Sequence, residues 1–379
     1  MPSLASHDQF MALALEQASY GQLFARPNPA VGCVLVKHNQ VVGVGFTQQA
    51  GGPHAEVMAI RAAGDLAVGA TAYVTLEPCS HYGRTAPCSL ALIEAKVAVL
   101  VYGCQDPNPL VAGQGLDQLR AANVEVIGPV MQLECATSNR GFLQRMTTNK
   151  PYVINKMAMS LDGRTAMDSG ESQWITGAEV RAQVHLLRAQ SCAVITGIGS
   201  VLRDNPSMNV RSDELVLAGV PHSAIERLKQ PLRVVLDSHL RMPATAKLLQ
   251  QYGPVLVLTC VTDPLQHQAL VNAGAEVQVC GADEHGKVDL IAVLSILGRR
   301  QCNQVLVEAG AALSGAFLQA GLTDHLVVYM APKLLGSNAK ALFNLPLEQM
   351  AQAYHLEIQS ISQVGHDWRI DATPKGADR

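Results

Sequence analysis

The sequence predicts an α/β protein of two domains, the first of them built on a mixed sheet covered by helices. One observation behind this is length, because 379 residues are about twice the usual size of a single domain. The other is pattern: strand-like and helix-like runs alternate, stop at a polar segment over 147–151 that ends in proline, and restart beyond it. We therefore expect domains at 1–147 and 148–379.

The first domain is predicted to open with a helix, a turn and a hairpin. Apolar residues recur at helical spacing over 7–20, and two prolines within 26–29 end that helix. Two β-branched runs, 31–36 and 41–46, flank a short polar connection typical of a hairpin. The elements expected next are a helix from about 54, a strand at 71–76, a helix near 88–95, strands at 97–102 and 124–127, and a helix near 132–145.

The second domain repeats the alternation with more strands. The expected elements are strands at 152–159, 193–196, 233–237, 255–259, 305–307 and 326–329, with helices at 178–189 and near 313–320. A polar stretch over about 212–230 is expected to be a loop. The glycine-rich segment 197–202 lacks both the third glycine and the later acidic residue of a dinucleotide-binding fingerprint, so it does not indicate a Rossmann domain.

Composition indicates which classes of binding partner the protein is expected to have. The net charge is −3 and aromatic residues make up 4%, so a nucleic-acid-binding surface is not expected, and a small molecule is the expected ligand. No signal peptide is apparent at the N-terminus, and the apolar runs are too short to cross a membrane. Nine unevenly spaced cysteines argue against a disulfide framework. These features favour a reducing, cytoplasmic setting.

Three short segments carry residues suited to a catalytic zinc ion. His54 stands at the predicted start of a helix, Cys79 follows the strand 71–76, and Cys88 comes nine residues later. An imidazole nitrogen and two thiolates suit a tetrahedral Zn²⁺ whose fourth position is left to water. Glu56 lies two residues from His54 and is not needed as a ligand, so it can carry a proton from that water to a departing amine.

Each part of this pattern has another interpretation when it is taken alone. A single His-x-Glu is close to noise, and two cysteines can be buried thiols or half of a structural zinc site that needs four ligands. The combination in this order, after a strand that ends in Glu-Pro-Cys, predicts a zinc-dependent hydrolytic deaminase with His54, Cys79 and Cys88 as ligands and Glu56 as the proton carrier.

Residues 51–56 and 75–79 resemble the cytidine/deoxycytidylate deaminase superfamily. Many members separate the two thiols by two residues, whereas eight separate them here. The longer segment 77–88, together with 28–34, resembles the riboflavin-pathway pyrimidine deaminase. The resemblance implies substrate contacts from Asn28, His81 and Arg84, the last two suited to a phosphate. A plain turn at Asn28 and a solvated loop at the other two are the alternatives.

The second half resembles the riboflavin-pathway reductase domain, which has a dihydrofolate-reductase-like fold and uses NADPH. The matching segments are 156–166, 170–176, 187–190, 204–206, 308–315 and 331–336. On local grounds the turn after the strand 305–307 could equally be an ordinary strand-to-helix turn or a pyrophosphate site at a helix N-terminus. Because both halves match in order over nearly the whole chain, the sequence is identified as a member of the bacterial bifunctional riboflavin deaminase/reductase family.

The resemblance also implies a set of reductase-site residues. On the cofactor side these are Ala158, Trp174, Ser200, Asp204, Ser238, Gly310, Ala311, Ala312, Leu313, Ser314, Gly315 and Ala316. On the substrate side they are Ser172, Arg188, Met208, Arg211 and Glu308. Lys156 is a candidate catalytic cation that polarises the group being reduced. Ala309 and Met208 depart from the glycine and leucine expected at their positions, which puts the geometry of the cofactor loop in question.

The family further implies zinc, NADPH, a phosphoribosylated pyrimidine substrate and a homodimer or larger assembly. The first step would remove the 2-amino group of 2,5-diamino-6-(5-phosphoribosylamino)pyrimidin-4(3H)-one, and the second would reduce the ribosyl group to ribityl. Three alternatives stay open at this point. They are a single-function nucleoside or tRNA deaminase, a structural zinc module joined to a nucleotide-binding regulator, and a protein in which only the reductase half is active.

Overall fold

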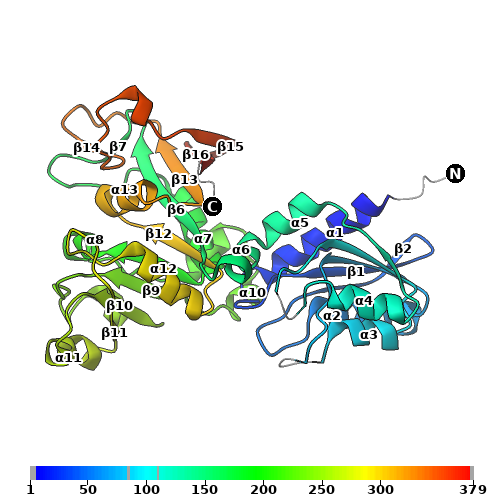
Figure 1. Cartoon of the computed structure of the whole chain (residues 1–379). Helices are drawn as coiled ribbons and strands as arrows, with labels where there is room; N and C mark the ends of the chain where they lie inside the picture. Colours follow the sequence, from blue (N-terminus) through cyan, green and yellow to red (C-terminus); the bar gives the residue numbers. More distant parts are fainter. Residues whose placement is uncertain (1–5, 83–85, 109–110, 376–379) are drawn as a thin grey trace. The chain divides into compact units, whose positions relative to one another are not determined.

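The computed structural model describes residues 6–82, 86–108 and 111–375. The chain forms two compact units, Met1–Asn149 and Lys150–Arg379 (Figure 1). Among the described helices, none is long and apolar enough to cross a lipid bilayer.

The first unit is built on a five-stranded mixed sheet in the order β2-β1-β3-β4-β5. Its strands are β1 (Gly32–Lys37), β2 (Gln40–Phe46), β3 (Thr71–Leu76), β4 (Val99–Cys104) and β5 (Glu125–Ile127). Its helices are α1 (His7–Gly21), α2 (Ala55–Ala63), η1 (Gly64–Ala67), α3 (Cys88–Glu94), α4 (Gln114–Ala121), α5 (Gln132–Ser138) and α6 (Arg140–Thr148). The hairpin pairs antiparallel with β3, whereas β3, β4 and β5 run parallel.

Glycines bring helix α2 close against strand β2. A Cβ atom on Gly43 would lie 2.3 Å from the carbonyl oxygen of Ala59, and one on Gly45 would lie 2.3 Å from that of Ala55. Any larger side chain would therefore push the helix off the sheet. The close approach matters for function because the candidate residues His54 and Glu56 lie at the start of this helix.

Two expectations for the first unit were wrong. Helix α4 falls in a stretch for which the sequence predicted no element. The single helix expected near 132–145 is two helices, interrupted at Asn139. The Asn139 side chain accepts a hydrogen bond from the Ala30 backbone N–H at 2.8 Å and donates one to the Ala30 carbonyl at 3.0 Å. This long-range pairing with the turn before β1 accompanies the break and cannot be seen in the local pattern.

The second unit contains a nine-stranded sheet in the order β11-β10-β9-β8-β12-β6-β13-β16-β15 and a two-stranded sheet of β14 and β7. The strands are β6 (Tyr152–Ser160), β7 (Arg164–Ala166), β8 (Ala193–Gly197), β9 (Leu232–Leu236), β10 (Val255–Thr259), β11 (Glu276–Val279), β12 (Gln304–Glu308), β13 (His325–Ala331), β14 (Lys340–Ala341), β15 (Leu356–Val364) and β16 (Asp367–Pro374). All neighbours from β11 to β13 run parallel, and β16 and β15 add an antiparallel edge.

Several helices of the second unit were missed from the sequence. The helices are α7 (Ala178–Gln190), α8 (Ile198–Asp204), α9 (Ser212–Leu217), α10 (His222–Ile225), η2 (Lys247–Gln250), α11 (Pro264–Asn272), α12 (Leu290–Arg299), α13 (Ala311–Gln319) and η3 (Met350–Gln352). The stretch expected to be a polar loop over 212–230 contains α9 and α10, and α12 and the β15-β16 hairpin were not predicted. The glycine-rich segment 197–202 caps and begins the short helix α8, with Gly197 at its N-cap.

Candidate active sites

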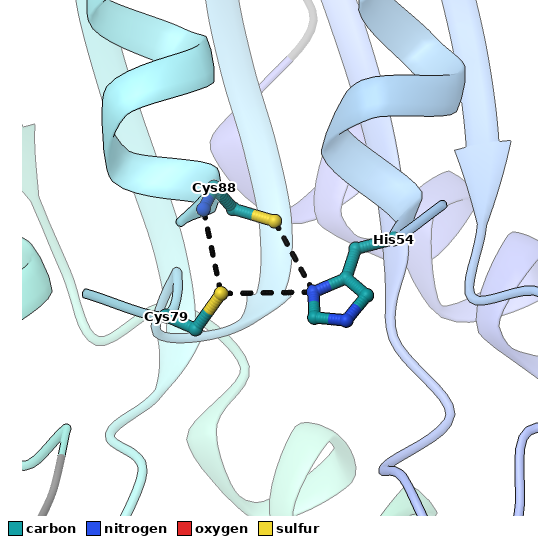
Figure 2. Close-up of side chains that lie close together, drawn as sticks. All are labelled: His54, Cys79 and Cys88. Atoms are coloured by element: carbon teal, nitrogen blue, oxygen red, sulfur yellow. Dashed lines mark hydrogen bonds between the residues drawn. The ribbon is translucent and has the colours of Figure 1, made fainter. Parts of the chain in front are cut away.

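The first candidate site lies where two helices of the first unit begin. His54 is the N-cap residue of α2, Cys88 is the first residue of α3, and Cys79 lies in the loop after β3. Figure 2 shows the imidazole and the two thiols pointing toward one another from these elements. Within the described part of the chain, these three residues form the group of metal-binding side chains whose ligand atoms all lie within 4.8 Å of one another.

The distances between these atoms fit a tetrahedral zinc ion. The His54 Nδ1 atom is 3.6 Å from Cys79 Sγ and 3.3 Å from Cys88 Sγ. Ligands bound to zinc at their usual bond lengths in tetrahedral geometry lie about 3.5 to 3.8 Å apart. Two thiols and one imidazole nitrogen are also the kind of donor set that zinc prefers. The arrangement thus fits the ion and leaves a fourth direction for water or substrate.

Electrostatics favour a thiolate at Cys79. A hydrogen bond from the Cys88 thiol lowers the pKa of Cys79 against the opposing effect of burial, and hydrogen bonds from His54 and the Cys88 backbone N–H lower it further. The Cys88 N–H lies 3.3 Å from Cys79 Sγ (Figure 2). Because metal ligands must be deprotonated, one half of the thiol pair is already prepared to bind a cation.

Glu56 is buried beside this cluster, with 3% of its surface exposed. Burial raises the pKa of its carboxyl group, and the negative charge of Cys79 raises it further. A carboxyl group with a raised pKa, placed in the first turn of α2 next to a ligand, suits proton transfer at a metal-bound reactant.

A second carboxylate, Glu77, holds the loop after Leu76 in place. Its Oε2 atom accepts hydrogen bonds from the backbone N–H groups of Asp106 at 3.4 Å and Gly113 at 3.1 Å, and Oε1 accepts one from Gly115 at 3.2 Å. A Cβ on Gly115 would lie 2.0 Å from the Pro78 carbonyl oxygen. Glu77 could not be singled out from the sequence except as part of a motif, because its partners lie 29 to 38 residues away along the chain.

The structure places the predicted substrate residues of this unit only in part. Asn28 lies in the turn before β1, where its backbone N–H donates to the Ala25 carbonyl at 3.0 Å. His81 lies in the segment between the two thiols. Arg84 lies outside the described residues.

The second candidate site is a cavity of about 910 Å³ in the second unit. It is bordered by the middle of β6, by the ends of β8 and β12, by α7, by α8 and by the start of α13. The predicted residues that line it are Lys156, Ala158, Ser172, Trp174, Arg188, Ser200, Asp204, Met208, Arg211, Glu308, Gly310, Ala311, Ala312 and Leu313. Cofactor and substrate residues expected from distant parts of the sequence therefore face one space.

Four predicted cofactor residues are not among those that line the cavity. Ser238 accepts a hydrogen bond from the Val288 backbone N–H at 3.0 Å. The Ser314 carbonyl accepts one from the Asn155 side chain at 3.0 Å, and Gly315 lies so close to Asn344 that a Cβ would approach its carbonyl oxygen to 2.5 Å. Ala316, the fourth, lies farther along the same helix, α13.

A buried ion-pair cluster forms the charged part of the cavity wall. Arg188 Nε lies 2.6 Å from Glu308 Oε1, Arg188 Nη2 lies 2.9 Å from Glu308 Oε2, and Arg188 Nη1 donates to the Asn209 carbonyl at 2.9 Å. Lys156 Nζ lies 3.8 Å from Glu308 Oε2. Lys156 and Glu308 are direct neighbours in the pairing of β6 with β12.

The charges of this cluster set its protonation states. Burial alone would raise the pKa of Glu308, but the charge of Arg188 and its hydrogen bonds, with Lys156, lower it to about 2. Burial lowers the pKa of Lys156, and the Glu308 carboxylate partly opposes this. Glu308 is thus an anion that holds two cations at the cavity wall.

The alanine at position 309 leaves the backbone of the cofactor loop unstrained. Gly310 has a φ of −76°, and Ala309 is not among the described non-glycine residues with positive φ. Met208, in contrast, has a φ of +56°, in the left-handed region that residues other than glycine rarely adopt.

Comparison with known proteins shows the family to which the chain belongs. Residues 4–104 match the zinc-binding region of cytidine and deoxycytidylate deaminases, and residues 151–370 match the RibD C-terminal domain. The riboflavin biosynthesis protein RibD of Escherichia coli is 47% identical over 361 residues, covering 95% of this chain and 97% of that protein. The chain belongs to the RibD family. The RibD of Haemophilus influenzae is 46% identical and covers 97% of each chain.

Solved structures of RibD proteins share the fold along the whole chain. One form of Acinetobacter baumannii RibD superimposes with a TM-score of 0.88 at 46% identity, covering 97% of this chain and 99% of that one. A diaminohydroxyphosphoribosylaminopyrimidine deaminase/5-amino-6-(5-phosphoribosylamino)uracil reductase of Thermotoga maritima gives a TM-score of 0.83 at 31% identity, covering 97% and 98%. The predicted α/β fold class is confirmed, with a cytidine-deaminase-like mixed-sheet domain followed by a RibD reductase domain.

RibD membership also confirms the predicted enzyme classes and cofactors. The chain is a bifunctional enzyme with a zinc-binding deaminase domain and a reductase domain, and Zn²⁺ and NADPH are the corresponding cofactors. The alternatives that gave the second half an unrelated role, or made the zinc module purely structural, do not agree with these matches.

Proposed function

We propose that this chain catalyses two successive steps of riboflavin synthesis on a phosphoribosylated pyrimidine. Residues 1–147 would hydrolyse the 2-amino group of 2,5-diamino-6-(5-phosphoribosylamino)pyrimidin-4(3H)-one and release ammonia. Residues 148–379 would then use NADPH to reduce the ribosyl group of 5-amino-6-(5-phosphoribosylamino)uracil to ribityl. The observation that carries the proposal is the convergence of His54, Cys79 and Cys88 beside the buried Glu56.

In the deaminase step, His54, Cys79 and Cys88 hold the metal and Glu56 moves the proton. When bound, Zn²⁺ lowers the pKa of a water molecule so that it can attack the ring carbon that carries the amino group. The Glu56 carboxylate accepts a proton from the attacking water, and the resulting acid delivers it to the departing nitrogen. Asn28, His81 and Arg84 are proposed to hold the substrate, with the two basic residues facing its phosphate.

In the reductase step, the wall residues bind and polarise the sugar. When bound, NADPH would supply a hydride. The C1′–O4′ bond of the ribosyl group would first open to an imine as the proton of the glycosidic nitrogen passes to O4′, and the hydride on C1′ together with a solvent proton on that nitrogen would then give the ribityl group. Lys156 polarises the group that accepts the hydride, and Glu308 keeps this ammonium in place at 3.8 Å. Ser172, Arg188, Met208, Arg211 and Glu308 form the proposed substrate side, and the predicted cofactor residues that line the cavity form the proposed cofactor side.

We also propose a cytoplasmic homodimer or larger homo-oligomer. The edge strand β15 supports an assembly, since Leu356, Ile358 and Ile361 expose 41%, 57% and 56% of their surfaces. Exposed apolar edge strands are surfaces that proteins usually cover. A reducing compartment would keep Cys79 and Cys88 available as ligands. Light scattering of an Ile358→Lys/Ile361→Lys variant should show a smaller particle than the unmodified protein.

A coupled assay tests the two activities together. The aminated pyrimidine should release ammonia without NADPH, and adding NADPH should then start its oxidation. The deaminated pyrimidine should consume NADPH without releasing ammonia. A zinc chelator should stop only the first step. If neither pyrimidine reacts, the proposed substrate is wrong.

Single substitutions test the role proposed for each residue in the two steps. Cys79→Ser should lose zinc and deamination together, and Glu56→Gln should retain zinc and lose deamination, because only the proton carrier is removed. Glu16→Gln, an exposed change on α1, is the matched control. Deamination by Glu56→Gln at the unmodified rate would reject the proton-transfer role. Unchanged reductase turnover by Lys156→Ala would remove that residue from the mechanism.

A further inference from the structure

A buried histidine in the cavity wall has no role in the mechanism described so far. His185 lies on α7, three residues before Arg188, and exposes 4% of its surface. Its side chain nevertheless lines the 910 Å³ cavity. It packs next to the residues expected to hold the substrate, so what its ring presents to the cavity can affect binding.

One ring nitrogen of His185 is fixed by the backbone. Nδ1 lies 3.1 Å from the N–H of Arg211, the N-cap residue of α9. An N–H group can only donate, so Nδ1 must be the unprotonated nitrogen and the proton of the neutral ring is on Nε2. In the part of the chain that the structure describes, Nε2 makes no hydrogen bond, and it is not among the fully buried polar atoms without a partner. It therefore keeps access to the cavity as a free donor.

The charges around the ring keep it in this neutral form. Burial, followed by the charges of Arg188 and Arg211, lowers the pKa of His185 to about 3, with Lys156 adding to the effect and Glu308 opposing it. The ring consequently remains uncharged throughout the neutral pH range. It adds a hydrogen-bond donor to a wall that already carries three cations and does not add a fourth positive charge.

We propose that the His185 Nε2–H group donates a hydrogen bond to a phosphate oxygen of the substrate's ribose 5-phosphate. This inference rests on the proposed reductase function. The cations that face His185 attract an anion, and a neutral donor among them complements a phosphate oxygen. Arg211 lies at the same point of the wall, with its own backbone anchored on the ring. The cofactor also contains phosphates, so a test must separate the two.

Two substitutions test separately the two hydrogen bonds of the His185 ring, the one that Nδ1 accepts from Arg211 and the one that Nε2 is proposed to donate. His185→Asn places an acceptor near the position of Nδ1 and so keeps the Arg211 anchor, but it does not reach as far as Nε2. His185→Gln places a donor near the position of Nε2. Calorimetry should show that His185→Asn binds ribose 5-phosphate about tenfold or more weakly, the range expected for a hydrogen bond to a charged group, whereas His185→Gln stays within about threefold. His185→Gln, which lacks an acceptor for the Arg211 N–H, should have the lower melting temperature of the two, so weaker binding by His185→Asn cannot come from lost stability.

The controls identify which group His185 contacts. The affinity for NADP⁺ and the deaminase rate should not change, and KM for the deaminated pyrimidine should rise in His185→Asn with little change in kcat. Unchanged ribose 5-phosphate binding by His185→Asn would overturn the inference. An equal loss of affinity for ribose would point to a hydroxyl contact, and a loss for NADP⁺ would point to a cofactor phosphate; either result overturns it. Ribose 5-phosphate binding can be measured even if the unmodified protein reduces neither pyrimidine, so failure of the proposed function would be recognised separately.

Discussion

Replacing Arg188 by leucine should destabilise the second unit strongly, because it leaves a buried carboxylate without its main partner. The Arg188 and Glu308 side chains are 15% and 9% exposed and share two hydrogen bonds, at 2.6 and 2.9 Å. Removing one member of such a buried pair costs about 3–5 kcal/mol. In a unit of this size each kcal/mol lowers the melting temperature by about 2–4 °C. Arg188→Leu should thus lower it by roughly 6–20 °C.

Tryptophan fluorescence can measure this loss of stability in the second unit. The chain's two tryptophans, Trp174 and Trp368, both lie in the second unit, so tryptophan fluorescence during urea unfolding follows that unit alone. Arg211→Leu is the matched control, since Arg211 is 53% exposed and its pair with Glu214 should contribute only about 0.3–0.5 kcal/mol. Arg188→Leu/Glu308→Leu should recover most of the lost stability, because no charge remains unpaired. Equal effects of Arg188→Leu and Arg211→Leu would refute the argument and leave Arg188 as a free substrate ligand.

The remaining predictions concern pH and the loop near the thiols. The folded-state pKa of Glu308 is about 2, below its ordinary 4.5, so the stability it contributes is complete above about pH 4.5 and is lost as pH falls toward 2. Urea midpoints measured by tryptophan fluorescence should therefore fall over this pH range, and they should fall less steeply in Arg188→Leu than in the unmodified protein. Glu77→Gln should weaken zinc retention during dialysis, because an amide cannot accept three N–H bonds as well as a carboxylate does. Gly115→Ala should lower zinc content and deaminase rate by displacing Pro78, whereas Gly281→Ala, where a Cβ meets no atom within 4 Å, should change neither.

The metal site was largely predictable from the sequence because each ligand is placed by a local signal. His54 caps α2 after a proline, Cys79 follows a strand that begins and ends as predicted, and Cys88 begins α3. Glycines at 43 and 45 then fix the distance between α2 and the sheet. What could not be predicted is the support around the ligands, since Glu77 is held by Gly113 and Gly115 from a loop and helix that the pattern did not indicate.

Element prediction failed where tertiary contacts override local pattern. Asn139 pairs with both polar groups of the Ala30 backbone, more than 100 residues away, at the point where one expected helix becomes two. The β15 strand was missed for a different reason, because eight of its nine residues are exposed and its apolar and polar side chains do not separate into a buried and a solvated face. Edge strands whose two faces are both exposed within the chain give little periodic signal.

The reductase cavity shows why a residue's identity can be predicted without its role. Lys156 lies within the predicted strand 152–159 and Glu308 follows the predicted strand 305–307, but only the parallel pairing of β6 with β12 makes them neighbours. Once they are paired, Glu308 must also compensate Arg188 from α7, because an isolated ammonium or guanidinium would be costly at this depth. Arg188 can therefore act on substrate mainly by holding Glu308, which in turn holds Lys156. That leaves the neutral His185 and Arg211, whose pair with Glu214 is partly exposed, as the wall groups that can meet the phosphate. The ribose 5-phosphate affinities of Arg188→Leu and His185→Asn therefore decide which of these residues bind the substrate and which hold other residues in place.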